Sequence, residues 1–278
     1  MAADHLEHYH EHGYAVVRGV FDRHEVGEMA AAFDRQYARG LGYGASFRQQ
    51  NTLYRLGDDP NLGRIVRMVQ WPSYVDPVLA RYRNDPRVLA ILAPLLGRDL
   101  KQIINQMHWK PPGAVASEWG YHQDIRFRRP REAYRSPATS YIQTGIAIDP
   151  HSEHNGAMTV LPGSHKLGEL EPSGGRVMDR PLDDDDLVRL GLDPADVISL
   201  TLDPGDLAFW HLHTIHGSGP NRSAMDRRFY LNGYVVAADC DRGEWAFRDG
   251  KPTTLGAPVL VHYEELFERP EPHYLEAG

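Results

Sequence analysis

Residues 203–236 read DPGDLAFWHLHTIHGSGPNRSAMDRRFYLNGYVV, and their alternation of turns and short apolar runs indicates the class of fold. Asp203-Pro204-Gly205-Asp206 is a turn signal, and the apolar residues that follow it predict a strand over 207–210. A second turn, Gly217-Ser218-Gly219-Pro220-Asn221, precedes a strand predicted over 228–236. Short strands separated by such turns indicate a β-sandwich, jelly roll or barrel.

The residues before this stretch continue the same pattern. Further strands are expected over 102–109, 140–148, 158–161 and 197–202. A long acidic segment at about 166–196 interrupts the series, and we expect it to be an insertion between strands. It would serve either as a surface excursion or as a lid over the substrate.

The first hundred residues are predicted to be mainly helical. Helices are expected over 6–11, 22–39, 77–83 and 86–96, with one strand over 14–17, because apolar residues in 26–33 recur at helical spacing after the N-cap Asp22. We therefore expect one domain over 1–278 of α+β composition. In it, a mainly helical cap over 1–100 packs on one face of a β core over 101–278.

Composition narrows the classes of protein. The 278 residues carry a formal net charge of −8, which argues against a nucleic-acid partner. The sequence has no apolar run near the roughly 18 residues of a membrane span, and its amino terminus does not resemble a signal peptide. The single Cys240 excludes an internal disulfide and fits a reducing compartment. We expect a cytoplasmic protein that acts on a small molecule, while its oligomeric state stays open.

His122-Gln123-Asp124 is the first candidate for chemistry. On an extended strand, residues two apart face the same side, so His122 and Asp124 would point into one space. An imidazole and a carboxylate supply two ligands of a metal site. The segment 211–216 offers three histidines as the third ligand, namely His211, His213 and His216.

Two histidines and one carboxylate leave open coordination positions, as in non-haem Fe(II) oxygenases. 2-Oxoglutarate would chelate the metal through two of these positions and O₂ would take the third. Arg227 follows the turn after His216, and its planar fork suits the distal carboxylate of 2-oxoglutarate better than a lysine would. Ser218 would add a hydroxyl donor to the same carboxylate.

In combination, these motifs resemble the phytanoyl-CoA dioxygenase (PhyH) family of 2-oxoglutarate oxygenases. In that family the arginine follows the distal histidine by eleven positions, and here 227 − 216 = 11, which favours His216 over its two neighbours. Further similar stretches are Lys110-Pro111-Pro112, Asn155-Gly156, 161–166 and the opening 9–17. The family often has a tryptophan near the co-substrate where this chain reads Gln143-Thr144-Gly145.

The resemblance implies a double-stranded β-helix core, also called a jelly roll or cupin-like barrel. It implies Fe(II) at His122, Asp124 and His216, and a 2-oxoglutarate pocket lined by Gln106. The implied reaction is hydroxylation of an unactivated C–H bond with release of succinate and CO₂, because Asp124 fills the position that related halogenating enzymes leave open for chloride. Desaturation, epoxidation and ring formation remain alternatives, as does a non-oxidative cupin-like metal enzyme.

The substrate residues are less well defined. Tyr121 and Arg126 flank the metal motif and are candidates for contact with substrate. The family acts on acyl-CoA thioesters, amino acids, phosphonates and natural-product scaffolds, and the sequence does not select among them.

Overall fold

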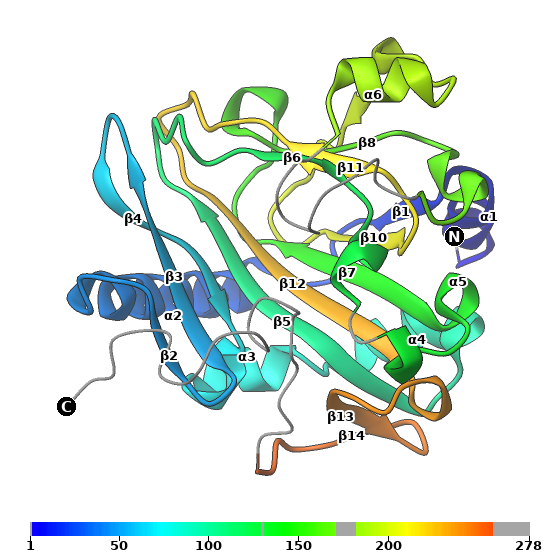
Figure 1. Cartoon of the computed structure of the whole chain (residues 1–278). Coiled ribbons are helices and arrows are strands. Elements are labelled where there is room, and N and C mark those ends of the chain that lie inside the picture. The colour runs from blue at the N-terminus through cyan, green and yellow to red at the C-terminus, as the bar shows by residue number, and fades with distance from the viewer. Residues whose placement is uncertain (1, 129–130, 171–181, 258–278) are drawn as a thin grey trace.

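Two antiparallel sheets form the molecule, in a computed structural model that describes residues 2–128, 131–170 and 182–257 (Figure 1). The large sheet has ten strands: β1 (Tyr14–Val17), β2 (Phe47–Gln49), β3 (Thr52–Asp59), β4 (Gly63–Gln70), β5 (Leu100–Lys110), β7 (Tyr141–Ala147), β10 (Leu207–His211), β12 (Arg227–Val236), β13 (Glu244–Arg248) and β14 (Lys251–Pro252). The small sheet has four: β6 (Trp119–His122), β8 (Met158–Val160), β9 (Ile198–Ser199) and β11 (His216–Ser218).

The chain passes repeatedly between the two sheets. Strands β5, β7, β10 and β12 lie in the large sheet, and the strands between them in sequence, β6, β8, β9 and β11, lie in the small sheet. This alternation is the double-stranded β-helix that the resemblance to the PhyH family implied. Because β10 and β11 belong to different sheets, the segment of three histidines between residues 211 and 216 crosses from one sheet to the other.

The helices of the described residues are α1 (Ala2–His12), α2 (Arg23–Gly42), α3 (Pro77–Tyr82), α4 (Pro86–Leu96), α5 (Pro137–Ser140) and α6 (Asp184–Arg189), with single 3₁₀ turns η1 (Pro72–Tyr74), η2 (Asp124–Phe127), η3 (Arg131–Ala133), η4 (Glu153–Asn155), η5 (Ser164–Leu167), η6 (Pro194–Asp196) and η7 (Ala237–Asp239). Of these, α2, α3 and α4 cover the outer face of the large sheet, whereas α6 lies against the small sheet. Asp22 and Glu25 form a capping box that begins α2. The buried residues of α2, among them Met29 and Phe33, join the main apolar cluster. The predicted helices of this region are therefore confirmed.

The first hundred residues are not only a helical cap, and this expectation needs correction. Residues 47–70 form β2, β3 and β4, which extend the large sheet beyond β5, and β1 pairs with β10 at the opposite edge of the same sheet. The sequence did not reveal β2–β4 because these strands carry apolar side chains on one face of the sheet and arginines on the other. Tyr54 packs on the apolar cluster, whereas the next residue, Arg55, lies on the opposite side.

Strand register places residues in rows across the inner face of the large sheet. One row runs Arg55, Met68, His108, Phe229 and Ala147, each directly opposite the next, so their side chains share one face. Gly145 lies beside this row, and a Cβ atom there would come within 2.1 Å of Cζ of Phe229. The absence of a side chain at Gly145 lets the Phe229 ring lie flat on the sheet.

The predicted insertion at 166–196 contains η6 and α6, while its residues 171–181 lie outside the described part of the chain. The described ends of the insertion lie against the small sheet, since Leu182 donates to the carbonyl of Tyr121 and Leu187 is buried beside Ile215. Among the described residues, no helix is both long and apolar enough to cross a membrane.

Candidate metal centre

His122 and Asp124 face the same space, although not on one continuous strand. Strand β6 ends at His122, and Asp124 begins the 3₁₀ turn η2. Gln123 between them keeps an extended backbone, with φ −108° and ψ 135°. Its side chain points the other way and donates to the carbonyls of His213 and Gly168, which anchors the turn.

The third member of the site comes from the neighbouring strand. His216 on β11 lies directly opposite His122 on β6. The His122 Nε2 atom lies 3.8 Å from one carboxylate oxygen of Asp124, and the His216 Nε2 atom lies 3.7 Å from the other. One potential ligand atom from each of the three residues lies within 4.8 Å of the others, a spacing that a single metal ion can bridge.

Both histidines are oriented by the backbone. The Nδ1 atom of His122 lies 2.8 Å from the carbonyl oxygen of Gly120, and that of His216 lies 2.9 Å from the carbonyl oxygen of Thr214. A carbonyl oxygen can only accept a hydrogen bond, so in each ring Nδ1 carries the hydrogen and Nε2 keeps its lone pair for a metal. Burial, followed by the nearby His216, lowers the pKa of His122 to about 4, which keeps the ring neutral.

Trp210 positions the carboxylate, a role that the sequence analysis missed. Its indole Nε1 donates to Oδ2 of Asp124 at 3.0 Å, and the Trp210 ring is buried. Burial raises the pKa of Asp124, but His216, His122, Arg128 and the Trp210 hydrogen bond together lower it below its ordinary value. The carboxylate is therefore ionised and held in one orientation.

A buried cationic pocket lies along the inner face beside these residues. Arg227 begins β12 directly opposite Lys110 at the end of β5. The Arg227 side chain is only 3% exposed, and its Nε has no hydrogen-bond partner in the described part of the chain. Burial lowers the pKa of Arg227 to about 10, so the guanidinium stays charged at neutral pH. An unpaired buried cation of this kind fits the distal carboxylate of 2-oxoglutarate.

Lys110 extends this pocket and was also missed as a site residue. Its Nζ donates to the hydroxyl of Ser218 at 2.7 Å, which leaves the proton of Ser218 for another acceptor. Burial, followed by the charge of Arg227, lowers the pKa of Lys110 well below its ordinary value. The Lys110-Pro111-Pro112 motif was the sequence signal that could have pointed to it. Asn221 fixes the turn between Ser218 and Arg227 by donating to the carbonyl of Lys110 at 2.8 Å.

Gln106 and His108 share the inner face with Lys110, because each lies two residues from the next on β5. The Gln106 Oε1 lies 3.0 Å from Nε2 of His108. Burial, then the charges of Arg227 and Lys110, lower the pKa of His108 to about 3. The structure thus places Gln106 on the inner face of β5 with a neutral His108 as its neighbour, and its contact with 2-oxoglutarate stays a prediction.

The other residues that the sequence offered as metal ligands or substrate contacts do not join the group of potential metal ligands. His211 lies 2.6 Å through Nε2 from the carbonyl of Ala138, and neither it nor His213 joins the group of potential metal ligands. Tyr121 as a substrate residue needs correction, because its ring packs with the Leu187 cluster on the side of the small sheet away from the metal residues. Residues adjacent on a strand point to opposite faces, so Tyr121 turns away from the space that His122 faces. Arg126 is buried on η2, and its charge contributes to the low pKa of His122.

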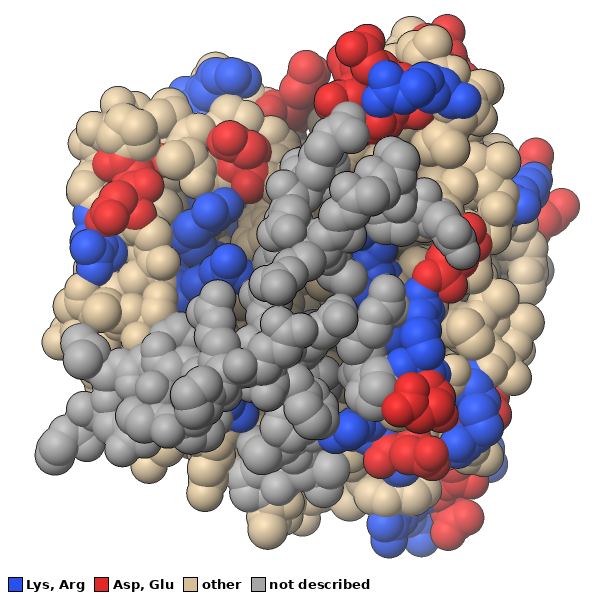
Figure 2. Space-filling model, viewed as in Figure 1, with Lys and Arg blue, Asp and Glu red and all other residues tan. Residues whose placement is uncertain are grey.

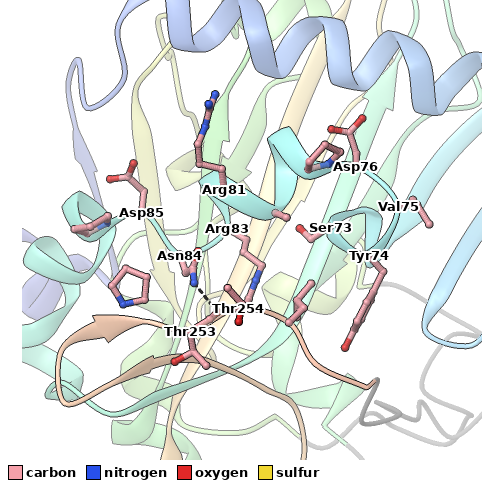
Figure 3. Close-up of a pocket in the computed structure, with 15 residues that line it drawn as sticks. Ser73, Tyr74, Val75, Asp76, Arg81, Arg83, Asn84, Asp85, Thr253 and Thr254 are labelled. Atoms are coloured by element: carbon pink, nitrogen blue, oxygen red, sulfur yellow. Dashed lines mark hydrogen bonds between the residues drawn. The ribbon is translucent and has the colours of Figure 1, made fainter.

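A separate pocket opens on the other side of the molecule, between η1, α3 and the residues after β14 (Figure 3). None of the metal-site residues line it. Its most buried cation, Arg83, already donates to Gln102 at 2.7 Å and to the carbonyls of Trp245 and Thr253. This pocket therefore has a structural explanation, and the chemistry belongs to the residues between the two sheets.

A double-stranded β-helix that holds two histidines and one carboxylate beside a buried arginine defines the class of non-haem iron(II) oxygenases. A profile of the phytanoyl-CoA dioxygenase (PhyH) family matches residues 9–229. The chain belongs to this family.

Curated relatives agree with the family, and solved structures agree with the fold. The chain is 28% identical over 247 residues to a Stutzerimonas stutzeri protein named "Probable alpha-ketoglutarate-dependent hypophosphite dioxygenase", covering 85% of this chain and 79% of the relative. It is 25% identical over 242 residues to peroxisomal phytanoyl-CoA dioxygenase of Bos taurus, covering 84% and 67%. The structure of EctD from S. alaskensis with bound Fe matches at a TM-score of 0.68 and 20% identity, covering 95% of this chain and 87% of EctD. The carbocyclase SnoK matches at 0.65 and 20% identity, covering 93% and 94%.

Proposed function

We propose that this protein hydroxylates a C–H bond of a small-molecule substrate, using Fe(II), 2-oxoglutarate and O₂ and releasing succinate and CO₂. One observation supports the proposal: the buried Arg227, whose Nε has no hydrogen-bond partner among the described residues, lies on the inner face of the sheet, between the two sheets that also carry His122, Asp124 and His216. A metal site alone would not need such a cation. A co-substrate with a distal carboxylate does.

The residues fit Fe(II) by the chemistry of their donor atoms. His122 and His216 would each provide an Nε2 lone pair, and Asp124 a carboxylate oxygen. When bound, the iron and 2-oxoglutarate supply the oxidising power for attack on a C–H bond. Arg227 and the hydroxyl of Ser218 would hold the distal carboxylate of 2-oxoglutarate, while Lys110 keeps Ser218 in place.

The residues of the site also bear on the alternative reactions. Asp124 occupies the ligand position that a halide would need, which favours hydroxylation over halogenation. A non-oxidative cupin-like enzyme would have no use for Arg227 in its buried, unpaired state. Desaturation, epoxidation or ring formation would depend on how the substrate lies, and the same iron site would serve them.

The similar proteins do not assign a substrate. Their names refer to hypophosphite, ectoine and phytanoyl-CoA, which differ in size and charge. The net charge of −8 supports a partner other than nucleic acid, and the single cysteine is consistent with a cytoplasmic enzyme.

Succinate release tests the proposal. The purified protein with Fe(II), O₂ and 2-oxoglutarate should release succinate slowly even without substrate, because 2-oxoglutarate turnover can proceed uncoupled. His216→Ala should abolish metal binding and succinate release, whereas His211→Ala should keep the metal stoichiometry. If the iron-loaded protein releases no succinate, or if His211→Ala loses the metal and His216→Ala does not, the proposal fails.

A further inference from the structure

Two more arginines reach the same inner face from strands that the sequence did not reveal. Arg55 lies in the row that continues through Met68 to His108. Arg67 is the extra residue of β4, since the register shifts so that Arg55 pairs with Met68 and Leu56 with Val66. Such a bulge redirects a side chain. Both side chains are half-buried.

Contacts show that Arg67 turns toward the metal side. Its guanidinium carbon lies 5.1 Å from the centre of the Trp119 ring, and that ring lies 5.2 Å from the ring of His108. Trp119 is on β6, the strand that ends at His122. Gly57 makes room for the stem of Arg67, because a Cβ atom there would lie 2.7 Å from Cδ of Arg67.

Among the described residues, no carboxylate forms an ion pair with Arg55 or Arg67, whereas Arg18, Arg35 and Arg228 each have one. Arg67 donates to the backbone oxygen of Glu118 at 3.0 Å, and the Glu118 side chain is exposed. Burial, followed by the charge of Arg55, lowers the pKa of Arg67, although the Glu118 carboxylate acts in the opposite direction. The two guanidinium groups therefore lie close enough to repel each other. Figure 2 shows basic side chains gathered on this face beside the β3–β4 hairpin.

A count of charges shows what these arginines can bind. In the loaded site of the proposed function, the charges of Fe(II), Asp124, 2-oxoglutarate and Arg227 cancel. Arg67, whose charge lowers the pKa of His108 and Lys110, and Arg55 beside it then remain as excess positive charge on the inner face, in a protein that is acidic overall. Two partly desolvated guanidinium groups without a carboxylate are stabilised by an anion.

We propose that Arg55 and Arg67 bind the acidic group of an organic substrate, a carboxylate or a phosphorus oxyanion, and orient its carbon chain along Trp119 and His108 toward the metal. The proposal rests on the proposed function and adds the substrate class. Arginine suits this role because its planar fork matches both kinds of oxyanion.

The test measures binding rather than turnover. The full-length protein, loaded with Mn(II) in place of Fe(II) and saturated with 2-oxoglutarate, is titrated with butyrate, n-butylphosphonate and n-butanol. Paramagnetic broadening of the proton signals of each probe reports its approach to the metal. We expect broadening for at least one of the two anions and none for n-butanol, and the two anion arms distinguish the carboxylate from the phosphorus oxyanion.

Matched variants locate the binding groups. Arg67→Gln and Arg55→Gln should each raise the Kd of the anion at least tenfold, and Arg67→Lys should restore part of the affinity. Arg64→Gln, an exposed arginine of the same strand β4 that pairs with Asp58, should leave the Kd unchanged. A melting temperature for each variant confirms that it is folded.

The results separate the two proposals. If Mn(II) and 2-oxoglutarate bind but neither anion is broadened, or n-butanol is broadened equally, the anionic substrate class is overturned while the proposed function stands. Anion binding that survives both Arg67→Gln and Arg55→Gln also overturns it. If Mn(II) and 2-oxoglutarate themselves fail to bind, the proposed function fails first.

Discussion

Replacing Trp210 by phenylalanine removes one hydrogen-bond donor from the metal site and keeps most of the ring packing. The indole Nε1 donates to Oδ2 of Asp124 at 3.0 Å, and the ring belongs to a buried apolar cluster with Phe229. A hydrogen bond to a charged group is worth about 1.5–3 kcal/mol. Since roughly 1.4 kcal/mol corresponds to a tenfold change in an equilibrium constant, the Kd for Fe(II) should rise about 10- to 100-fold, the range typical of lost outer-shell partners.

The assay is Fe(II) binding under anaerobic conditions, in competition with a coloured chelator. Trp109→Phe is the matched control, because the Trp109 indole donates to Asp226 at 2.8 Å from a similarly buried position on the helix-covered face. Trp109→Phe should lower the free energy of unfolding without changing the Kd for Fe(II). If Trp210→Phe binds Fe(II) within twofold of the parent, or if both variants weaken binding equally, Trp210 does not position the carboxylate.

Three further changes test other parts of the site and fold. Arg227→Lys should raise the KM for 2-oxoglutarate about 10- to 100-fold, because a buried bidentate pair is lost, while Fe(II) affinity without 2-oxoglutarate stays unchanged; an unchanged KM would contradict the role of Arg227. Gly145→Ala should lower the free energy of unfolding in urea by about 1–3 kcal/mol through overpacking against Phe229, whereas Gly27→Ala, with no atom near the added Cβ, should not destabilise. Burial lowers the pKa of His211 to about 4, so the unfolded chain takes up this proton first as the pH falls. Stability from His211 is present above pH 6.5 and is lost between about 6.5 and 4, by about 3 kcal/mol; His211→Gln should flatten that part of the unfolding profile, and an unchanged profile would exclude this explanation.

The sequence was sufficient where the relevant signal is local. Turn residues between short apolar runs predicted the strands of the core, and Asp22 predicted the start of α2. The choice of His122, Asp124, His216 and Arg227 followed from two short motifs and from the eleven-residue step from His216 to Arg227 that the family resemblance implies. The structure brings His122, Asp124 and His216 together as those motifs required.

Local patterns failed where one face of a strand borders the site. Strands β3 and β4 carry arginines on the inner face and apolar residues on the helix-covered face, so they lack the purely apolar or cleanly solvated pattern of an ordinary strand. The prediction that Tyr121 contacts substrate failed for a related reason. Tyr121 directly precedes His122 on β6, so its side chain lies on the opposite face of that strand.

The class of fold and the candidate site residues could therefore be predicted from short local motifs, because each motif spans only a few positions. The groups that surround these residues could be identified only in the folded chain. Trp210 reaches Asp124 across 86 positions, and Lys110 reaches Ser218 across 108. Arg67 reaches Trp119 only because one extra residue shifts the register of β4. Strand pairing is non-local, and a shift of a single residue exchanges the two faces of a strand, so these neighbours exist only once the sheets have formed.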